Sequence, residues 1–121
     1  MAKILVVDDS PTEVHQLVEI LKRHGHEVVS AVTGREGVAM AVSELPDLVL
    51  MDVVMPEVNG FQATRQIVRE PRTAHIPVII VTAKDQDTDR VWGERQGARG
   101  YLTKPVKEAD LMATVNQALG G

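Results

Sequence analysis

Short, continuous apolar runs separated by amphipathic stretches constrain the fold of this chain more than any other feature of its sequence. The runs are rich in Val, Ile and Leu and do not alternate in polarity. This pattern is typical of strands that are buried on both faces of a parallel sheet. We therefore expect strands at Lys3–Val7, Glu27–Ala31, Leu48–Met51, Val78–Val81 and Gly100–Leu102.

The stretches between these runs carry apolar residues at the i, i+3, i+4, i+7 spacing of amphipathic helices. Ser10 and Thr33 precede two of the stretches as N-caps, each with a capping-box glutamate three residues later. Gly25 and Gly97 are placed to end helices. The apolar sets are Val14, Leu17, Val18 and Leu21, then Val38, Ala41, Val42 and Leu45, and finally Leu111, Val115 and Ala118.

The segment Asp85–Gln96 is the least amphipathic of the expected helices. Val91 and Trp92 are its main apolar side chains among many polar ones. Little burial gives weak anchoring, so this helix is a candidate for movement. A tryptophan on a polar helix either packs partly against the core or belongs to a docking face, and both remain open.

Five strand–helix pairs in succession predict a doubly wound α/β sandwich, with right-handed crossovers and helices on both faces of one parallel sheet. The chain has 121 residues and shows no linker, repeat or low-complexity tract. That length suits one domain with one core. We expect a single domain over residues 1–121, without a separate output domain.

Composition excludes several classes of function. The absence of cysteine excludes a disulfide framework, cysteine-based catalysis and cysteine-based zinc binding. A net charge of -4 argues against a large nucleic-acid footprint, and three aromatic residues are too few for a base-stacking platform. The apolar runs are too short to cross a bilayer, and no secretory signal follows Met1. We expect a cytoplasmic protein with no nucleic-acid partner and no membrane insertion.

Polar side chains follow four of the five expected strands at their carboxyl ends, where open parallel sheets bind ligands. Asp8 and Asp9 follow the first strand, Asp52 the third and Thr82 the fourth. After the fifth strand comes the sequence Thr103-Lys104-Pro105. Three carboxylates, a hydroxyl and an ammonium group are thus expected at one edge of the sheet.

Three neighbouring carboxylates repel one another, and one lysine does not neutralise them. Either some of them are protonated or a cation binds. Oxygen ligands without histidine or cysteine suit Mg²⁺, which shares its coordination shell with phosphate oxygens. A carboxylate beside Mg²⁺ can attack a phosphoryl donor and form an aspartyl phosphate, whose charge Mg²⁺ and Lys104 would neutralise.

The sequences VVDDSP, LVLMDVVMPEVNG, PVIIVTA and GYLTKP resemble, in order and spacing, the receiver domain of CheY-like response regulators. The resemblance covers the whole chain and implies a flavodoxin-like sheet of order 2-1-3-4-5 with five helices. It implies that Asp52 is the phosphoacceptor and that Lys104, Thr82 and Tyr101 respond to the phosphoryl group. Asp9, Asp52 and the backbone carbonyl of Val54 would bind Mg²⁺ directly, and Asp8 would act mainly through water. The Lys104–Pro105 bond would be cis.

At finer grain, the sequences DDSPTE, HGHEV, VVMPEVNGFQATRQ and KDQDTDRVWGERQGARGYLTKP resemble the PilH group, stand-alone regulators of type IV pilus twitching motility. This resemblance implies a CheA-like sensor histidine kinase as phosphodonor and a monomeric switch rather than an enzyme. An unidentified output protein would bind the face formed by residues 85–119. A phosphate sink for a shared kinase and a receiver of another pathway, such as flagellar chemotaxis, are the alternatives.

Two other protein classes share part of the pattern. A flavodoxin-like electron carrier would need a hydroxyl-rich phosphate loop and aromatic stackers, whereas Asp8 and Asp9 repel phosphate when no metal is bound. A haloacid-dehalogenase-type phosphatase expects its nucleophile after the first strand with a second aspartate two residues later, but Ser10 stands there. Val54 and Lys84 are expected to flank the phosphoryl pocket, and His24 and His26 to lie in a surface turn.

Overall fold

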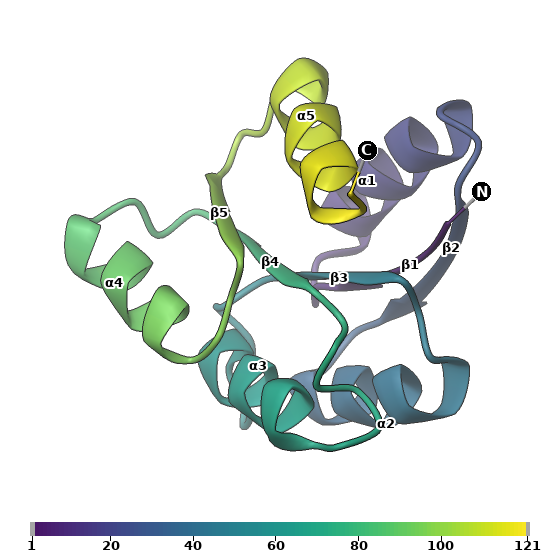
Figure 1. The fold of residues 1–121 in the computed structure, drawn as a ribbon. Coiled ribbons are helices and arrows are strands. Elements are labelled where there is room, and N and C mark those ends of the chain that lie inside the picture. Colours follow the sequence, from purple (N-terminus) through teal and green to yellow (C-terminus); the bar gives the residue numbers. More distant parts are fainter. Residues whose placement is uncertain (1, 121) are drawn as a thin grey trace.

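A computed structural model describes residues 2–120 as five parallel strands and five helices that alternate along the chain. The helices lie on both faces of the sheet (Figure 1). The strands are β1 Lys3–Val7, β2 Glu27–Ala31, β3 Leu48–Met51, β4 Val78–Thr82 and β5 Gly100–Thr103. The helices are α1 Pro11–Arg23, α2 Gly34–Glu44, α3 Gly60–Arg69, α4 Asp87–Arg95 and α5 Glu108–Ala118.

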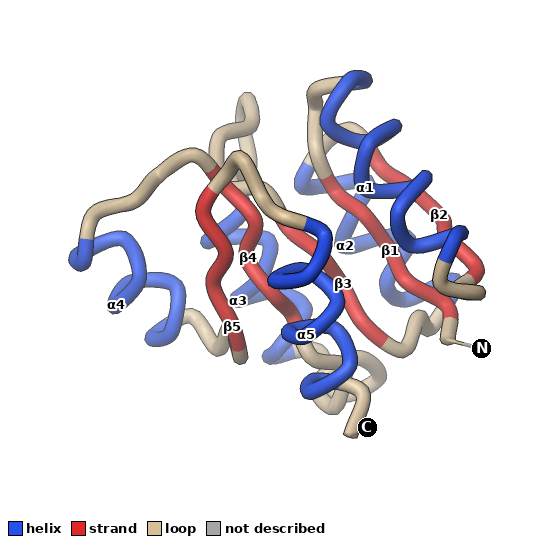
Figure 2. The backbone as a smooth tube through the Cα atoms, turned by 90° about the horizontal axis from the view of Figure 1, so that it is seen from above, coloured by secondary structure: helices blue, strands red, loops and turns tan. Residues whose placement is uncertain are grey.

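The sheet has the order β2-β1-β3-β4-β5, and every neighbouring pair is parallel. This confirms the predicted doubly wound fold and its strand order. Three strands have the expected bounds. The fourth and fifth are each one residue longer, because Thr82 and Thr103 pair with each other in the ladder. Seen from above, α1 and α5 cross the near face of the strands (Figure 2).

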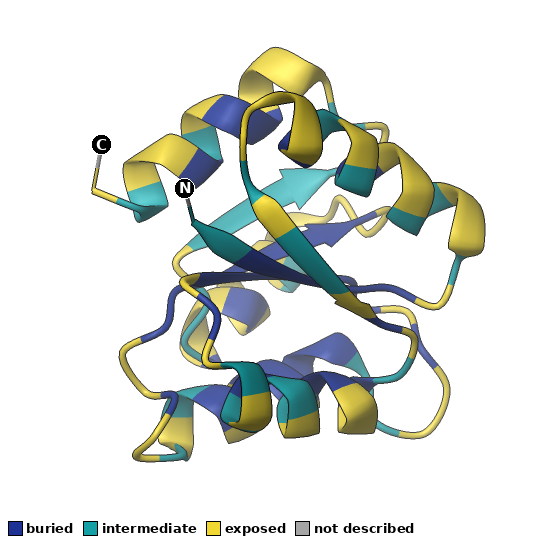
Figure 3. Cartoon of the chain, turned by 90° about the vertical axis from the view of Figure 1, so that its right-hand side faces the viewer, coloured by how far each residue is buried: buried dark blue, intermediate teal, exposed yellow. Residues whose placement is uncertain are grey.

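Alternate side chains along the buried strands enter two separate halves of the core. Ile4 and Val6 pack with α1 and α5, whereas Leu5 and Val7 pack with α2 and α3. Strands β3 and β4 are buried throughout, and the outer surfaces of the helices are exposed (Figure 3). Burial on both faces explains why these strands are continuously apolar rather than alternating. None of the helices within residues 2–120 is long and apolar enough to cross a membrane.

Helix α4 has little side-chain burial, as the sequence predicted, and it meets the sheet through a glycine. Val91 and Trp92 are each 49% exposed, and the buried residue of the helix is Gly93. A Cβ atom at Gly93 would lie 2.8 Å from Ile80 Cδ1, so the helix approaches the sheet through a residue without a side chain. The helix also begins two residues later than expected and ends one residue earlier. The weak side-chain anchoring predicted for α4 is therefore confirmed.

The helix starts correct a second expectation. The hydroxyls of Ser10 and Thr33 accept hydrogen bonds from the backbone N–H groups of Glu13 and Glu36, as predicted. The reciprocal bonds of a capping box do not form, since the Ser10 N–H donates to Asp8 and the Glu36 carboxylate accepts from the Val32 N–H. Gly25 and Gly97 follow α1 and α4 with φ values of 86° and 105°, the left-handed conformation that glycine favours.

Candidate functional site

Asp8 and Asp52 follow adjacent strands and are fixed by the extension of the sheet ladder. The Asp8 N–H donates to the Ala31 carbonyl at 3.1 Å, and the Asp52 N–H donates to the Val7 carbonyl at 2.9 Å. Asp8 is 1% exposed and Asp52 is 7% exposed. The parallel sheet therefore presents two nearly buried carboxyl groups side by side at its carboxyl edge.

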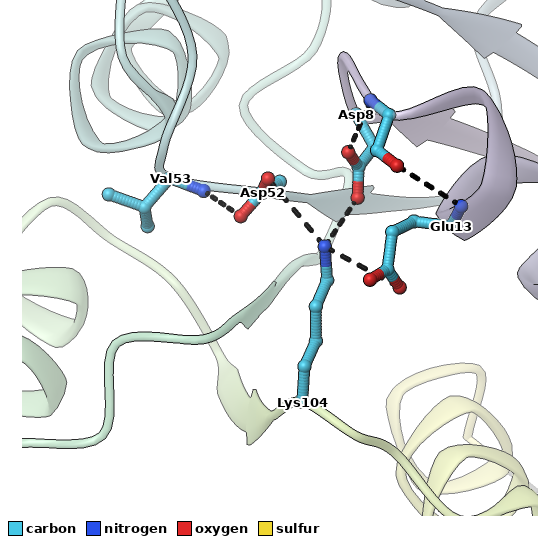
Figure 4. A network of polar contacts seen from close by, with 6 residues as sticks. Asp8, Glu13, Asp52, Val53 and Lys104 are labelled. Atoms are coloured by element: carbon cyan, nitrogen blue, oxygen red, sulfur yellow. Dashed lines mark hydrogen bonds and ion pairs between the residues drawn. The ribbon is translucent and has the colours of Figure 1, made fainter.

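The two carboxylates differ in their hydrogen bonds (Figure 4). Asp8 accepts from the Ser10 N–H at 2.9 Å and from Lys104 Nζ at 2.7 Å. Asp52 accepts from the Val53 N–H at 2.8 Å through Oδ1, and its Oδ2 lies 3.6 Å from Lys104 Nζ. Asp8 thus uses both of its oxygens, whereas Oδ2 of Asp52 is available to react.

Lys104 is the cation of the site and is held by the strand-end geometry. Its backbone N–H donates to the Thr82 carbonyl at 2.8 Å, beside the last pair of the β4–β5 ladder. Its ammonium group also lies 3.8 Å from Glu13 Oε2, a contact that the sequence did not indicate. Burial by itself would lower the pKa of Lys104. The hydrogen bond to Asp8 and the charge of Asp52 outweigh burial and raise it, so the ammonium form persists.

Asp52 carries the opposite balance. Burial raises its pKa above the ordinary aspartate value, and the charge of Lys104 opposes this effect without cancelling it. The negative charge of Asp8 raises the pKa further. A carboxylate in these surroundings is unfavourable until more positive charge arrives. The site is therefore electrostatically prepared for a cation.

The donor set fits a hard divalent cation. Asp8, Asp9 and Asp52 each offer a carboxylate oxygen, and these oxygens all lie within 4.8 Å of one another. Asp9 is exposed, so the group opens to solvent on one side. Oxygen ligands with room for water suit Mg²⁺. Val54 lies in the same loop as Asp52 with a side chain that is 56% exposed, and its carbonyl remains a predicted ligand.

Thr82 places an unpartnered hydroxyl at the site. The residue is fully buried, and Oγ1 is the one buried side-chain polar atom within residues 2–120 that lacks a hydrogen-bond partner. The nearby hydroxyl lowers the pKa of Asp52, but its geometry does not meet the criteria for a hydrogen bond to that carboxylate. A buried unpaired hydroxyl is costly. A phosphoryl oxygen on Asp52 would offer it an acceptor.

Tyr101 lies on β5, next to strand β4, which ends at Thr82. The hydroxyl group of Tyr101 is turned outward. Tyr101 Oη donates to the Lys84 carbonyl in the β4–α4 loop at 2.8 Å. The guanidinium group of Arg90 lies 5.0 Å from the centre of the Tyr101 ring and donates to Thr103 at 3.1 Å. Arg90 and Lys84 therefore hold Tyr101 in this position. The inward swing of Tyr101 remains a prediction.

The structure also places the remaining residues that the sequence analysis singled out. The Lys104–Pro105 bond is cis, as the resemblance implied. His24 Nε2 lies 2.9 Å from Glu108 Oε2, and His26 Nδ1 accepts from the Ala2 N–H, so these residues serve the surface turn as expected. The sequence Asn59-Gly60 was expected to shape the loop beneath the acid site, and Gly60 does so. A Cβ atom there would lie 2.0 Å from the Asp52 carbonyl oxygen, so glycine permits the loop beneath Asp52.

Comparison with known proteins agrees with this geometry. Residues 4–116 match the response regulator receiver domain family. Protein PilH of Pseudomonas aeruginosa is 61% identical over 121 residues, which are 100% of both chains. At this identity and coverage the whole chain shares one ancestry with that relative.

Solved structures give the same result for the fold. The receiver domain of sensor histidine kinase PA1611 from P. aeruginosa, described with a magnesium ion coordinated in its active-site cleft, has a TM-score of 0.92 at 30% identity. That similarity covers 99% of this chain and 98% of the other. Chemotaxis protein CheY4 of Vibrio cholerae also has a TM-score of 0.92 at 30% identity, over 98% of both chains.

Proposed function

This chain belongs to the response regulator receiver domain family, and we propose that it is a signalling switch phosphorylated on Asp52 by a sensor histidine kinase. The observation that carries the proposal is the position of Asp52. Its buried carboxylate lies beside Asp8 and Asp9, with the Lys104 ammonium group 3.6 Å from Oδ2. This arrangement combines a nucleophile with the charges that phosphoryl transfer needs.

In the proposed reaction, Asp52 Oδ2 forms a bond to phosphorus as the bond between phosphorus and the donor's imidazole nitrogen breaks. Asp8, Asp9, Asp52 and the Val54 carbonyl would hold Mg²⁺, and the ion would supply positive charge to stabilise the transferred phosphoryl group. Lys104 leaves Asp8 and contacts a phosphoryl oxygen. The chain thus serves as a phosphoacceptor that promotes only its own phosphorylation and dephosphorylation, not as an enzyme acting on other substrates.

The output of the switch would pass through Thr82 and Tyr101. A phosphoryl oxygen gives the Thr82 hydroxyl its missing hydrogen-bond partner, and movement of Thr82 makes room for Tyr101 to turn inward. Turning would break the bond between Tyr101 and Lys84 and loosen α4, which is anchored chiefly by Gly93. The surface formed by residues 85–119 would then change its affinity for a partner protein.

The pathway is proposed from similarity. The full-length match to PilH, together with the sequence resemblance to the PilH group, supports a role in type IV pilus twitching motility with a CheA-like kinase as donor. A phosphate sink is the second candidate, since it would use the same acid site without any output partner.

Phosphorylation with acetyl phosphate and MgCl₂ tests the proposal. Intact mass spectrometry should detect one added phosphoryl group on the wild-type protein and none on Asp52→Asn. Asp110→Asn, which removes an exposed aspartate from α5, is the matched control and should be labelled like the wild type. Labelling of Asp52→Asn at the wild-type rate would show that the assignment is wrong. Equal binding of a candidate output protein before and after phosphorylation would instead favour the sink.

A further inference from the structure

Three arginines surround a hollow at the ends of α3 and α4, on the edge of the sheet opposite the acid site. Helix α3 begins at Gly60, whose N–H donates to the Val53 carbonyl beside Asp52, and it runs away from that site to Arg69. Arg65 and Arg69 are one helical turn apart and share a face of α3. Arg95 is the last residue of α4.

Gly97 brings the two helix ends together. It has a φ of 105°, and a Cβ atom there would lie 2.9 Å from both methyl groups of Val68 on α3. Only glycine fits this contact without strain. The close approach places Arg95 beside Arg65 and Arg69 around a hollow of ≈ 250 Å³, which Val68, Gln96 and Gly97 complete.

The same two arginines border a second, more apolar hollow between α2 and α3. It has a volume of ≈ 420 Å³ and is lined by Val38, Val42 and Pro71 in addition to Arg65 and Arg69. Glu70 also lines it, but its carboxylate accepts a hydrogen bond from Arg72 at 2.8 Å. Arg65 and Arg69 therefore stand between an apolar surface and a cationic one.

None of the three arginines forms an ion pair or hydrogen bond with any residue between 2 and 120, whereas Arg23 and Arg72 both pair with glutamates. All three are exposed. The chain as a whole has a net charge of -4, so this is a positive region on an acidic molecule. Guanidinium groups bind carboxylates through two parallel hydrogen bonds, which favours an acidic ligand with defined geometry.

We propose that this arginine surface, defined as Arg65, Arg69 and Arg95 with the two adjoining hollows, binds an acidic segment of a partner protein that also carries aliphatic side chains. Carboxylates would pair with the arginines, and an aliphatic group would pack on Val38, Val42 and Pro71. Nucleic acid fits less well, because a large phosphate footprint needs more cations and none of the lining residues is an aromatic stacker.

The surface is separate from the phosphorylation machinery. Asp52, Thr82, Lys104 and Tyr101 line neither hollow. Residues 95–97 belong to the segment 85–119 proposed as the output face, but Arg65 and Arg69 lie outside it. The proposal therefore adds a second contact area on α3, and it stands or falls independently of phosphorylation on Asp52.

Fluorescence anisotropy with a short labelled peptide of glutamate and leucine residues provides the test. Arg65→Glu/Arg69→Glu should weaken binding about tenfold or more, since it reverses two of the three charges. Lys22→Glu/Arg35→Glu changes the net charge equally at exposed, unpaired positions elsewhere and should leave binding within about twofold. Equal loss in both double variants would mean that net charge alone attracts the peptide, and the proposal would be wrong.

Arg95→Glu gives an independent readout from the other helix and should also weaken binding, even if the double variant unfolds. Amide chemical shifts of the wild-type protein should change at residues 65–69 and 95–97 when the peptide is added. Tighter, Arg65-dependent binding of anionic phosphatidylglycerol vesicles or duplex DNA would overturn the choice of a protein partner. Labelling by acetyl phosphate should persist in Arg65→Glu/Arg69→Glu, which separates failure of this surface from failure of the acid site.

Discussion

The Lys104 ammonium group donates a hydrogen bond to Asp8, with Nζ 2.7 Å from Oδ2, although Asp52 is the proposed phosphoacceptor. Lys104 Nζ is 3.6 Å from Asp52 Oδ2 and 3.8 Å from Glu13 Oε2. Three carboxylates thus compete for one cation. Phosphorylation of Asp52 would change the outcome of this competition, because a phosphoryl group carries more charge than a carboxylate.

Replacing Lys104 should separate phosphorylation from the change of shape. Lys104→Gln removes the cation but leaves Asp8, Asp9 and Asp52 to hold Mg²⁺, so we expect labelling by acetyl phosphate to persist at a rate reduced by up to about 10²-fold. The fluorescence of Trp92, which is half exposed on α4, should no longer respond to phosphorylation.

Lys107→Gln is the control for this experiment, since Lys107 is exposed and lies three residues away. It should retain both labelling and the fluorescence response. A full tryptophan response in phosphorylated Lys104→Gln would show that Lys104 does not couple the acid site to α4.

The strands and the acid site were predictable because they depend on local sequence and on one topological rule. Val78–Val81 is apolar at every position, as a strand covered on both faces must be, and parallel strands gather their carboxyl ends at one edge. Asp8, Asp52 and Lys104 could therefore be brought together without knowledge of the structure. The strand order came from the family resemblance, because periodicity alone does not order the strands.

Side-chain partners were less predictable, because they depend on the relative placement of distant elements. Glu13 suits a capping box, yet its carboxylate lies near Lys104, which follows β5 and is remote in sequence. Val91 and Trp92 are the main apolar side chains of α4, yet Gly93 makes the close contact with Ile80. A glycine at a tight helix–sheet contact leaves no hydrophobic signal in the sequence, so the sequence could not indicate this contact.

The pKa of Asp52 gives a pH dependence that can be measured in metal-free buffer. Burial raises this pKa in the folded protein above the ordinary aspartate value of 3.8. Well below pH 3.8, Asp52 is protonated in both the folded and the unfolded state, so its ionisation does not affect the free energy of unfolding. As the pH rises, the unfolded state ionises first, so the folded state loses relative stability until the pH passes the raised pKa.

Asp52→Asn removes this loss. In EDTA, its free energy of unfolding relative to wild type should increase as the pH rises from 3.8 and then level off. The height of the plateau measures the displacement of the pKa, at about 1.4 kcal/mol per pH unit. Urea denaturation between pH 3.5 and neutrality would provide the measurement, with Asp110→Asn as a control for the loss of one negative charge. A difference that stays constant across the range would contradict a raised pKa.

Because the Thr82 hydroxyl is unpaired, we expect its removal to affect stability in the opposite direction from removal of the hydroxyl of another buried threonine. Thr73 Oγ1 donates to the Ile67 carbonyl at 2.6 Å, and Thr64 Oγ1 donates to the Gly60 carbonyl at 2.7 Å. Thr82→Val replaces an unsatisfied hydroxyl with a methyl group of similar size. It should therefore stabilise the unphosphorylated protein by about 1 kcal/mol, whereas Thr73→Val should destabilise it by a similar amount.

Although Thr82→Val should gain stability, it should lose the response to phosphorylation. Thr82→Val cannot donate to a phosphoryl oxygen, so the tryptophan response to phosphorylation should be lost while Asp52 still accepts the label. Thr73→Val lies away from the acid site and should keep that response at a temperature where it remains folded. Urea denaturation of the two variants in EDTA gives the comparison. Equal destabilisation of Thr82→Val and Thr73→Val would mean that the Thr82 hydroxyl already has a partner, and its proposed role as the sensor of the phosphoryl group would fail.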